Sequence, residues 1–176
     1  WNNYEFIELC HRLDRDTSGV LLLAKSRPAL LRAQKALKES GTVEKRYFTL
    51  LVGRWKGEDR DVDSALISNR LESGERMVEI DDDGKPAKSR FSPKAKYRDC
   101  CLCEVQIFSG RTHPIRVHAL SLGHPVAGDT QYGDRDSHNF IKELGLQRLF
   151  PPLHFLCLPQ AAAPPHLLAH APIPRQ

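Results

Sequence analysis

The stretch CLCEVQI, residues 101–107, alternates in the way that a half-buried β-strand does. One face of this strand carries the side chains Cys101, Cys103, Val105 and Ile107. The five cysteines, at positions 10, 100, 101, 103 and 157, do not form the two Cys-X-X-Cys pairs of a structural zinc site. Because a free cysteine packs as a small hydrophobic residue, we expect those of this strand in the core.

Further short β-like segments surround this strand. They are predicted at 62–67, 75–80 and 87–92, with turn signals at residues 73–74 and 82–85. Another strand is predicted at 45–52, where Lys45 and Tyr47 share a face with Thr49 and Leu51. Strands that follow one another so closely predict a mostly antiparallel sheet.

Two helices are expected to accompany the sheet. Residues 20–24 read VLLLA and predict a buried strand, and Ser26 and Pro28 then signal a helix over about 28–40. Residues 112–114 read THP and predict the start of a second helix of about two turns. The predicted fold class is therefore α+β, a mixed, mostly antiparallel sheet with flanking helices.

Length and composition indicate one globular domain. The chain has 176 residues, and its longest uncharged apolar run, at 20–24, is far too short to cross a bilayer. The first residues show no signal peptide pattern, so we expect a cytoplasmic protein without membrane contact. The net charge is +4, and the basic excess lies in residues 1–60 and 109–176, as would suit a polyanionic ligand.

The first polar cluster reads HRLDRDTSG and covers residues 11–19, directly before the predicted strand at 20–24. A carboxylate between guanidinium groups has a lowered pKa and stays ionised, as a carboxylate nucleophile or base must. A salt-bridged turn capped by Thr17 and Ser18 would give the same pattern. The charge pattern alone does not rank Asp14 above Asp16.

The second polar cluster reads GRTHPIRVH and covers residues 110–118. Backbone N–H groups at a helix start, together with Arg111 and Arg116, would bind a phosphate or pair with a carboxylate. His113 and His118 are five residues apart, which is not the spacing of two metal ligands on one helix face. We therefore expect no metal site there.

Tyr47 is the aromatic residue of the predicted strand at 45–52. An aromatic side chain on a strand stacks well on an unpaired or flipped base. A half-buried tyrosine with a packing role alone fits the strand equally well.

Together, three segments resemble the RluA family of pseudouridine synthases. They are HRLDRDTSG at 11–19, KRY at 45–47 leading to Val52-Gly53, and GRTHPIRVH at 110–118 followed by GHPVAGD at 123–129. The resemblance covers roughly residues 7–150. The segments SGERMV at 73–78 and GKPA at 84–87 further resemble the synthase C branch, which acts on the large ribosomal RNA.

The resemblance implies roles for individual residues. Asp14 would be the catalytic aspartate, Tyr47 would stack on the target base and serve in proton transfer, and Arg116 would pair with Asp14. Arg12 would contact the RNA as the uridine is flipped. The further RNA contacts expected from the basic clusters are Arg15, Lys45, Arg111 and His113.

The implied activity is isomerisation of uridines to pseudouridine in large-subunit ribosomal RNA, by a monomer without metal or organic cofactor. Asp14 would act as a nucleophile on base or ribose, or would remove a ribose proton to give a glycal. The alternatives are a synthase acting on tRNA or on both RNAs, and a non-catalytic ribosomal RNA-binding module. An acidic residue in a phosphate-binding cleft would only weaken a mere binder, which favours the enzyme.

Two departures from the family pattern are visible. Pro114 replaces the usual glutamine, but proline fits a first helical turn, so Arg116 is expected to be aimed correctly. Residues 151–176 hold seven prolines, and the family's last strand is expected to be lost there. We therefore expect residues 1–150 to be a catalytic domain without its first strands, followed by a divergent proline-rich tail at 151–176.

Overall fold

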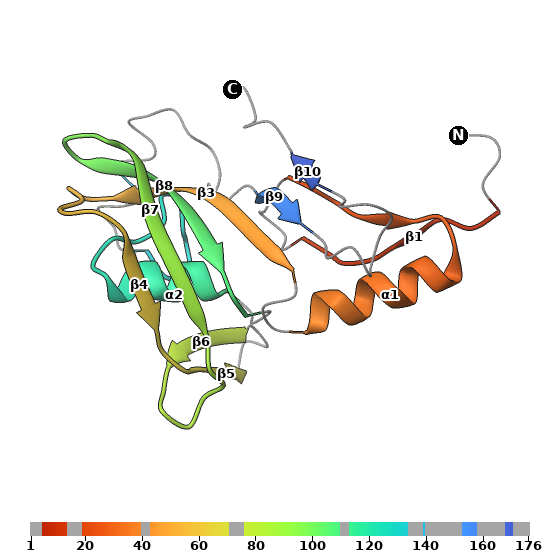
Figure 1. The fold of residues 1–176 in the computed structure, drawn as a ribbon. Coiled ribbons are helices and arrows are strands. Elements are labelled where there is room, and N and C mark those ends of the chain that lie inside the picture. Colours follow the sequence, from red (N-terminus) through yellow and green to blue (C-terminus); the bar gives the residue numbers. More distant parts are fainter. Residues whose placement is uncertain are drawn as a thin grey trace.

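The computed structural model describes residues 5–13, 19–39, 43–70, 76–109, 113–133, 139, 153–157 and 168–170. Its strands form a six-stranded sheet of order β10-β9-β3-β8-β7-β4 and two two-stranded ribbons, β1-β2 and β5-β6. All of these pairs are antiparallel, and two helices pack beside them, which confirms the predicted α+β class (Figure 1). The elements are β1 (Glu8–Leu9), β2 (Leu23–Ala24), α1 (Arg27–Lys38), β3 (Glu44–Val52), β4 (Arg60–Asp63), β5 (Leu66–Arg70), β6 (Arg76–Ile80), β7 (Lys88–Lys96), β8 (Cys100–Ile107), α2 (Pro114–Ser121), β9 (Leu153–Cys157) and β10 (Leu168–His170).

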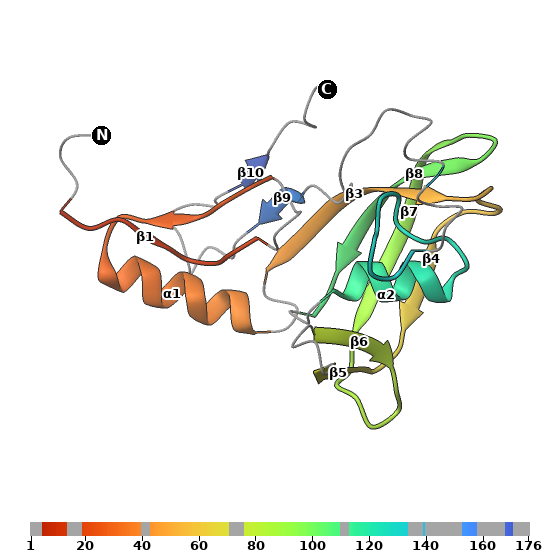
Figure 2. The same ribbon diagram turned by 180° about the vertical axis from the view of Figure 1, so that it is seen from behind.

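The centre of the large sheet is formed by β3, β8 and β7. Its buried face carries the alternating residues that the sequence predicted, because Cys101, Cys103 and Val105 of β8 are fully buried. Ile115 and Ala119 of α2 pack against the same cluster, so α2 covers this face (Figure 2). The predicted strands at 45–52 and 101–108 and the predicted core cysteines of β8 are confirmed.

Helix α1 begins where its sequence signals predicted. The Ser26 side chain accepts a hydrogen bond from the Ala29 N–H, and Pro28 lies in the first turn, where its missing N–H costs nothing. The apolar residues Leu30, Ala33 and Ala36 are buried on one side of the helix. They pack α1 against the β1-β2 ribbon, at a distance from α2 along the molecule (Figure 1).

The buried strand expected at 20–24 is wrong over most of its length. Only Leu23–Ala24 forms a strand, and Leu21 and Leu23 are 43% and 49% exposed. The ribbon packs with one face on α1, so Val20 and Ala24 turn inward while the alternate leucines turn to solvent. The strand expected at 62–67 is likewise two strands, because β4 joins the large sheet and β5 pairs with β6.

The expectation that the last strand is lost is also wrong. β9 pairs antiparallel with β3, and β10 pairs with β9. Residues 153–157 read LHFLC and contain no proline, since the prolines of this region flank them at 151, 152 and 159. Proline removes a ladder hydrogen bond only where it stands within a strand, so β9 can occupy an internal position of the sheet.

Helix α2 and the turn before β7 also match their predictions. α2 begins at Pro114 and is followed by Gly123 in the left-handed conformation, after about two turns. The turn at 81–84 is closed by the Gly84 N–H, which donates to the Asp81 carbonyl at 2.9 Å. The turn expected at 73–74 lies outside the described residues.

Candidate functional site

The predicted site residues divide into two groups. Arg12, Lys45, Tyr47, His113 and Arg116 belong to the described part of the chain. Asp14, Arg15 and Arg111 lie outside it, so the roles predicted for these three stay predictions.

His11 anchors the entrance to the first polar cluster. Its Nε2 accepts a hydrogen bond from the Leu22 N–H at 3.2 Å, so the ring proton belongs on Nδ1, which then donates to the Arg12 carbonyl at 3.3 Å. Burial is the main cause that lowers the pKa of His11, and the nearby positive charge of Lys45 lowers it further. His11 is therefore a neutral residue that holds residues 11–13 beside β2 and close to β3.

Tyr47 links the two parts of the core. It packs against the large cluster under α2, and also against a smaller cluster that includes Leu13, Val20 and Val43. Leu13 directly precedes Asp14 in the sequence. β3 thus brings Tyr47 next to the segment that leads into the predicted catalytic residue.

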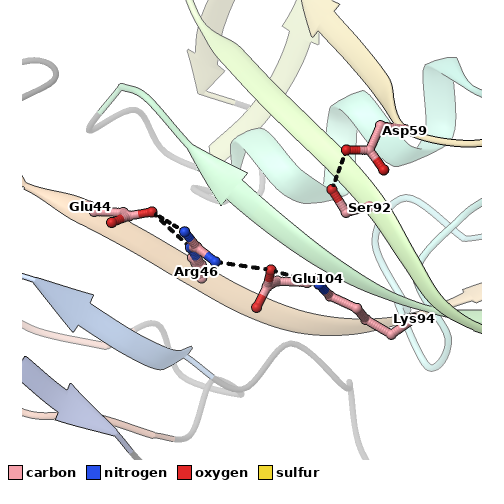
Figure 3. Close-up of polar contacts among 6 residues, drawn as sticks. All are labelled: Glu44, Arg46, Asp59, Ser92, Lys94 and Glu104. Carbon is pink, nitrogen blue, oxygen red and sulfur yellow. Dashed lines mark hydrogen bonds and ion pairs between the residues drawn. The ribbon is translucent and has the colours of Figure 1, made fainter.

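Lys45 and Tyr47 lie on a different face of β3 from Arg46. The Arg46 guanidinium contacts Glu44 through Nε at 2.8 Å and Glu104 through Nη1 at 3.3 Å, and Glu104 also contacts Lys94 (Figure 3). Its charge is therefore balanced by carboxylates of its own sheet. Burial lowers the pKa of Lys45, which lies on the other face.

Arg116 forms a bidentate pair with Asp129. Its Nε donates to Oδ2 at 2.7 Å and its Nη2 to Oδ1 at 2.5 Å. Asp129 also accepts backbone N–H bonds from Gln131 and Tyr132, each at 3.0 Å, and its side chain is fully buried. Burial is the largest influence and raises the pKa of Asp129, but the bonds from Arg116, Tyr132 and Gln131 together outweigh it and hold the pKa below its ordinary value.

Tyr132 joins the second polar cluster to the β5-β6 ribbon. The Arg116 guanidinium lies over its ring, 4.6 Å from the centroid. The Tyr132 hydroxyl accepts the Val78 N–H at 2.9 Å and is 3.2 Å from His113 Nδ1. The structure therefore brings His113 and Arg116 together around Tyr132.

No role was predicted from the sequence for Asp129 or Tyr132. Asp129 closes the segment GHPVAGD, which was noticed only for its resemblance to a family motif. The available signal was a lone carboxylate in a neutral segment, thirteen residues after an arginine that needs a partner. In the structure, the backbone of His113 has a φ of 51°, which is uncommon for a residue with a side chain.

His118 is a core residue in the described structure. It is fully buried, and its Nδ1 lies 2.9 Å from Ser89 Oγ on β7. In the part of the chain that the structure describes, no three His, Cys, Asp or Glu side chains gather to hold a metal ion. Neither helix described is long and apolar enough to span a membrane.

Comparisons with known proteins place these residues in context. The family described as RNA pseudouridylate synthase matches residues 2–121. The ribosomal large subunit pseudouridine synthases C of Haemophilus influenzae and of Escherichia coli K12 are both 46% identical to the chain, over 145 and 147 residues. These alignments cover 82% of the chain but 45% and 46% of the relatives, so the chain spans about half the length of the curated relatives it matches.

Two solved human structures have a similar fold. Human RNA pseudouridylate synthase domain containing 1 matches with a TM-score of 0.80 and 26% identity, over 96% of this chain and 70% of that one. Human RNA pseudouridylate synthase domain containing 4 matches with a TM-score of 0.78 and 25% identity, over 98% and 73%. The family match includes β3 and α2, whereas Asp129 and Tyr132 lie beyond its end.

Proposed function

The chain belongs to the RNA pseudouridylate synthase family, and from this premise we propose that it isomerises uridines of large-subunit ribosomal RNA to pseudouridine. The family match over residues 2–121 carries the proposal of the reaction. The choice of RNA rests on the likeness to two relatives named as large-subunit synthases.

The reaction exchanges one bond to the ribose for another. The bond between uracil N1 and ribose C1′ breaks, the base turns, and a bond forms between C5 and C1′. The C5 proton then leaves and N1 takes up a proton, so atoms and electrons balance without an oxidant or reductant. The target nucleotide must leave its stack for this to happen, since C1′ and C5 are not accessible within a helix.

Asp14 is the proposed catalytic residue, acting either as a nucleophile or as the base that gives a glycal. In both versions it must be ionised, and Arg116 is proposed to pair with it for that reason. The Arg116 contact with Asp129 uses Nε and Nη2, and Nη1 forms no hydrogen bond with the part of the chain that the structure describes. One guanidinium can therefore serve two carboxylates.

Tyr47 is proposed to stack on the flipped uracil and to take part in proton transfer. Its packing against two clusters supports this role, because these contacts hold the half-buried ring in place. The residues proposed to contact the RNA are Arg12, Arg15, Lys45, Arg111 and His113.

The proposal describes a monomer that works in the cytoplasm. Its catalytic domain comprises residues 1–150 together with β9 and β10, which belong to the same sheet. An isomerisation that balances internally needs no redox cofactor. The expectation that it also needs no metal belongs to the same proposal.

The test is pseudouridine formation on protein-free large-subunit rRNA transcripts, mapped by carbodiimide treatment and primer extension, with tRNA transcripts in parallel. Asp14→Asn is compared with Asp16→Asn, which removes a carboxylate from the same segment. We expect new stops on the ribosomal transcript from the parent chain and from Asp16→Asn. Asp14→Asn should lose about a thousandfold in rate or more, about 4 kcal/mol of transition-state stabilisation.

Each other outcome contradicts a defined part of the proposal. Primer-extension stops on the tRNA transcript alone would mean that tRNA, and not ribosomal RNA, is the substrate. Unchanged stops with Asp14→Asn would overturn its catalytic role. The absence of new stops on both RNAs, with every variant folded, would favour a non-catalytic RNA-binding module.

A further inference from the structure

Arg116 is held more firmly than an arginine at a protein surface. Its Nε and Nη2 form a planar fork with both oxygens of Asp129, and its guanidinium lies on the Tyr132 ring. An arginine side chain otherwise has many rotamers, and fixing it normally costs entropy in each binding event. The fork and the ring together remove that freedom beforehand.

The buried Asp129 carboxylate has a desolvation cost, so stability alone does not explain its presence. Its carboxylate is removed from water and accepts four hydrogen bonds, two from Arg116 and two from backbone N–H groups. A buried ion pair of this kind often contributes no more stability than apolar residues of similar size. Its geometry, by contrast, determines where the guanidinium points.

The segment that bears Asp129 and Tyr132 is itself fixed to the elements of the site. The Ala127 N–H donates to the Leu50 carbonyl at 2.8 Å, and Val126 forms a bridge with Leu51, so the segment is tied to β3. The Tyr132 hydroxyl accepts the Val78 N–H and so ties it to β6. The position of Arg116 is thereby set relative to β3, the strand that carries Tyr47.

We propose that Asp129 is a positioning residue, which together with the Tyr132 ring fixes the Arg116 guanidinium in the place where it acts in the reaction. This inference rests on the proposed function. Asp129 touches neither the RNA nor the reacting atoms and acts only through Arg116. Its loss should therefore slow the reaction and leave RNA binding almost unchanged.

The test is a double-mutant cycle under single-turnover conditions, with enzyme in excess over the transcript. Asp129→Asn should lower the maximal rate by about ten- to a hundredfold, which is the cost of a reacting group misplaced by about an ångström. The enzyme concentration that gives half the maximal rate should change less than about threefold. In an Arg116→Lys background the same substitution should have no further effect, because a lysine cannot form the fork. Additive losses in the double variant would overturn the proposal.

Ser89→Ala is the matched structural control. It removes a buried hydrogen bond to His118 on the same helix α2 and leaves the contacts of Arg116 in place. We expect this variant to lose stability and keep its maximal rate. A rate loss equal to that of Asp129→Asn would mean that any weakening of α2 slows the reaction, which contradicts the proposal.

A second measurement separates this inference from the proposed function. In ¹⁵N-arginine spectra of the free protein, Arg116→Lys identifies the Arg116 Nε–H signal, which should be protected from solvent exchange and lose that protection in Asp129→Asn. An unprotected signal in the parent chain would overturn the inference whatever the activity. A protected signal in a protein that modifies no RNA would instead reject the proposed function, while the contact between Asp129 and Arg116 would stand.

Discussion

His118 illustrates how one buried side chain makes stability depend on pH. Burial lowers the pKa of His118 in the folded protein, whereas a histidine in an unfolded chain titrates at about 6.5. Below that pH the unfolded chain binds a proton that the folded chain does not. Stability is therefore complete above about pH 6.5 and is lost as the pH falls.

We predict that His118→Asn flattens this dependence. An asparagine amide can keep the contact with Ser89, but it does not titrate. Below pH 6.5 the free energy of unfolding of the variant should therefore fall by up to about 1.4 kcal/mol less per pH unit than that of the parent chain. Urea unfolding at pH 7.5, 6.5 and 5.5 measures the difference. The burial of His11 also lowers its pKa, so some dependence should remain. An unchanged slope would mean that His118 is protonated when folded.

At the scale of single residues, the sequence predicted which face of β3 Tyr47 occupies, because strand alternation is local. It also offered a phosphate or a carboxylate as the partner of Arg116. The partner Asp129 was not predicted, because that contact depends on how residues 122–128 fold back onto β3. Such a turn is determined by tertiary contacts, which a charge pattern does not reveal.

At the scale of the elements, the turn before β7 brings two stretches of backbone into close approach. A Cβ atom on Gly84 would lie 2.5 Å from the Leu66 carbonyl carbon and 2.8 Å from the Asp81 carbonyl oxygen. Leu66 and Lys85 exchange two backbone hydrogen bonds of 2.9 Å at this point. The start of β5 is thus packed directly on the turn.

We predict that Gly84→Ala lowers the free energy of unfolding by about 2–3 kcal/mol, because backbone atoms must move to admit the methyl group. Gly57→Ala is the control, since Gly57 has a φ of +82° but open space around it. It should cost only the backbone strain, about 1 kcal/mol. Chemical denaturation of the two variants measures both values, and equal costs would show that the close approach at Gly84 relaxes freely.

Element prediction succeeded where the signals were local. The cap and first-turn proline of α1, and the alternation of β8, each arise from a few consecutive residues. Residues 20–24 read as a buried strand because they are apolar, but a two-residue ribbon packed on α1 has only one face to bury. Hydrophobicity alone does not say how many neighbours a strand will have.

For the whole molecule, the internal position of β9 is the feature with the largest predicted consequence. We predict that Leu156→Pro lowers the free energy of unfolding by on the order of 2–3 kcal/mol, because proline removes a backbone donor and fits an internal strand poorly. Gln160→Pro, beyond the end of β9 in the sequence, should have a much smaller effect. Thermal unfolding compares them, and equal midpoints would argue that β9 adds nothing to stability.

The overall fold class followed from the sequence, while the order of the strands did not. β9 was not predicted because the prolines around it dominated the composition of residues 151–176. Its partner β3 lies far away in the sequence, so no local pattern indicated the pairing. Long-range pairing of this kind depends on which segment of the whole chain pairs best with the edge of the sheet.

The same pairing has a consequence for folding during synthesis on the ribosome. β3 leaves the exit tunnel about a hundred residues before β9, and at roughly 5–20 residues per second this interval lasts about 5–20 s. Throughout it one edge of β3 has no strand to pair with, and an open edge is a template for neighbouring nascent chains. Crowded polysomes and a shortage of chaperones should therefore reduce the yield of this protein more than its final stability would suggest.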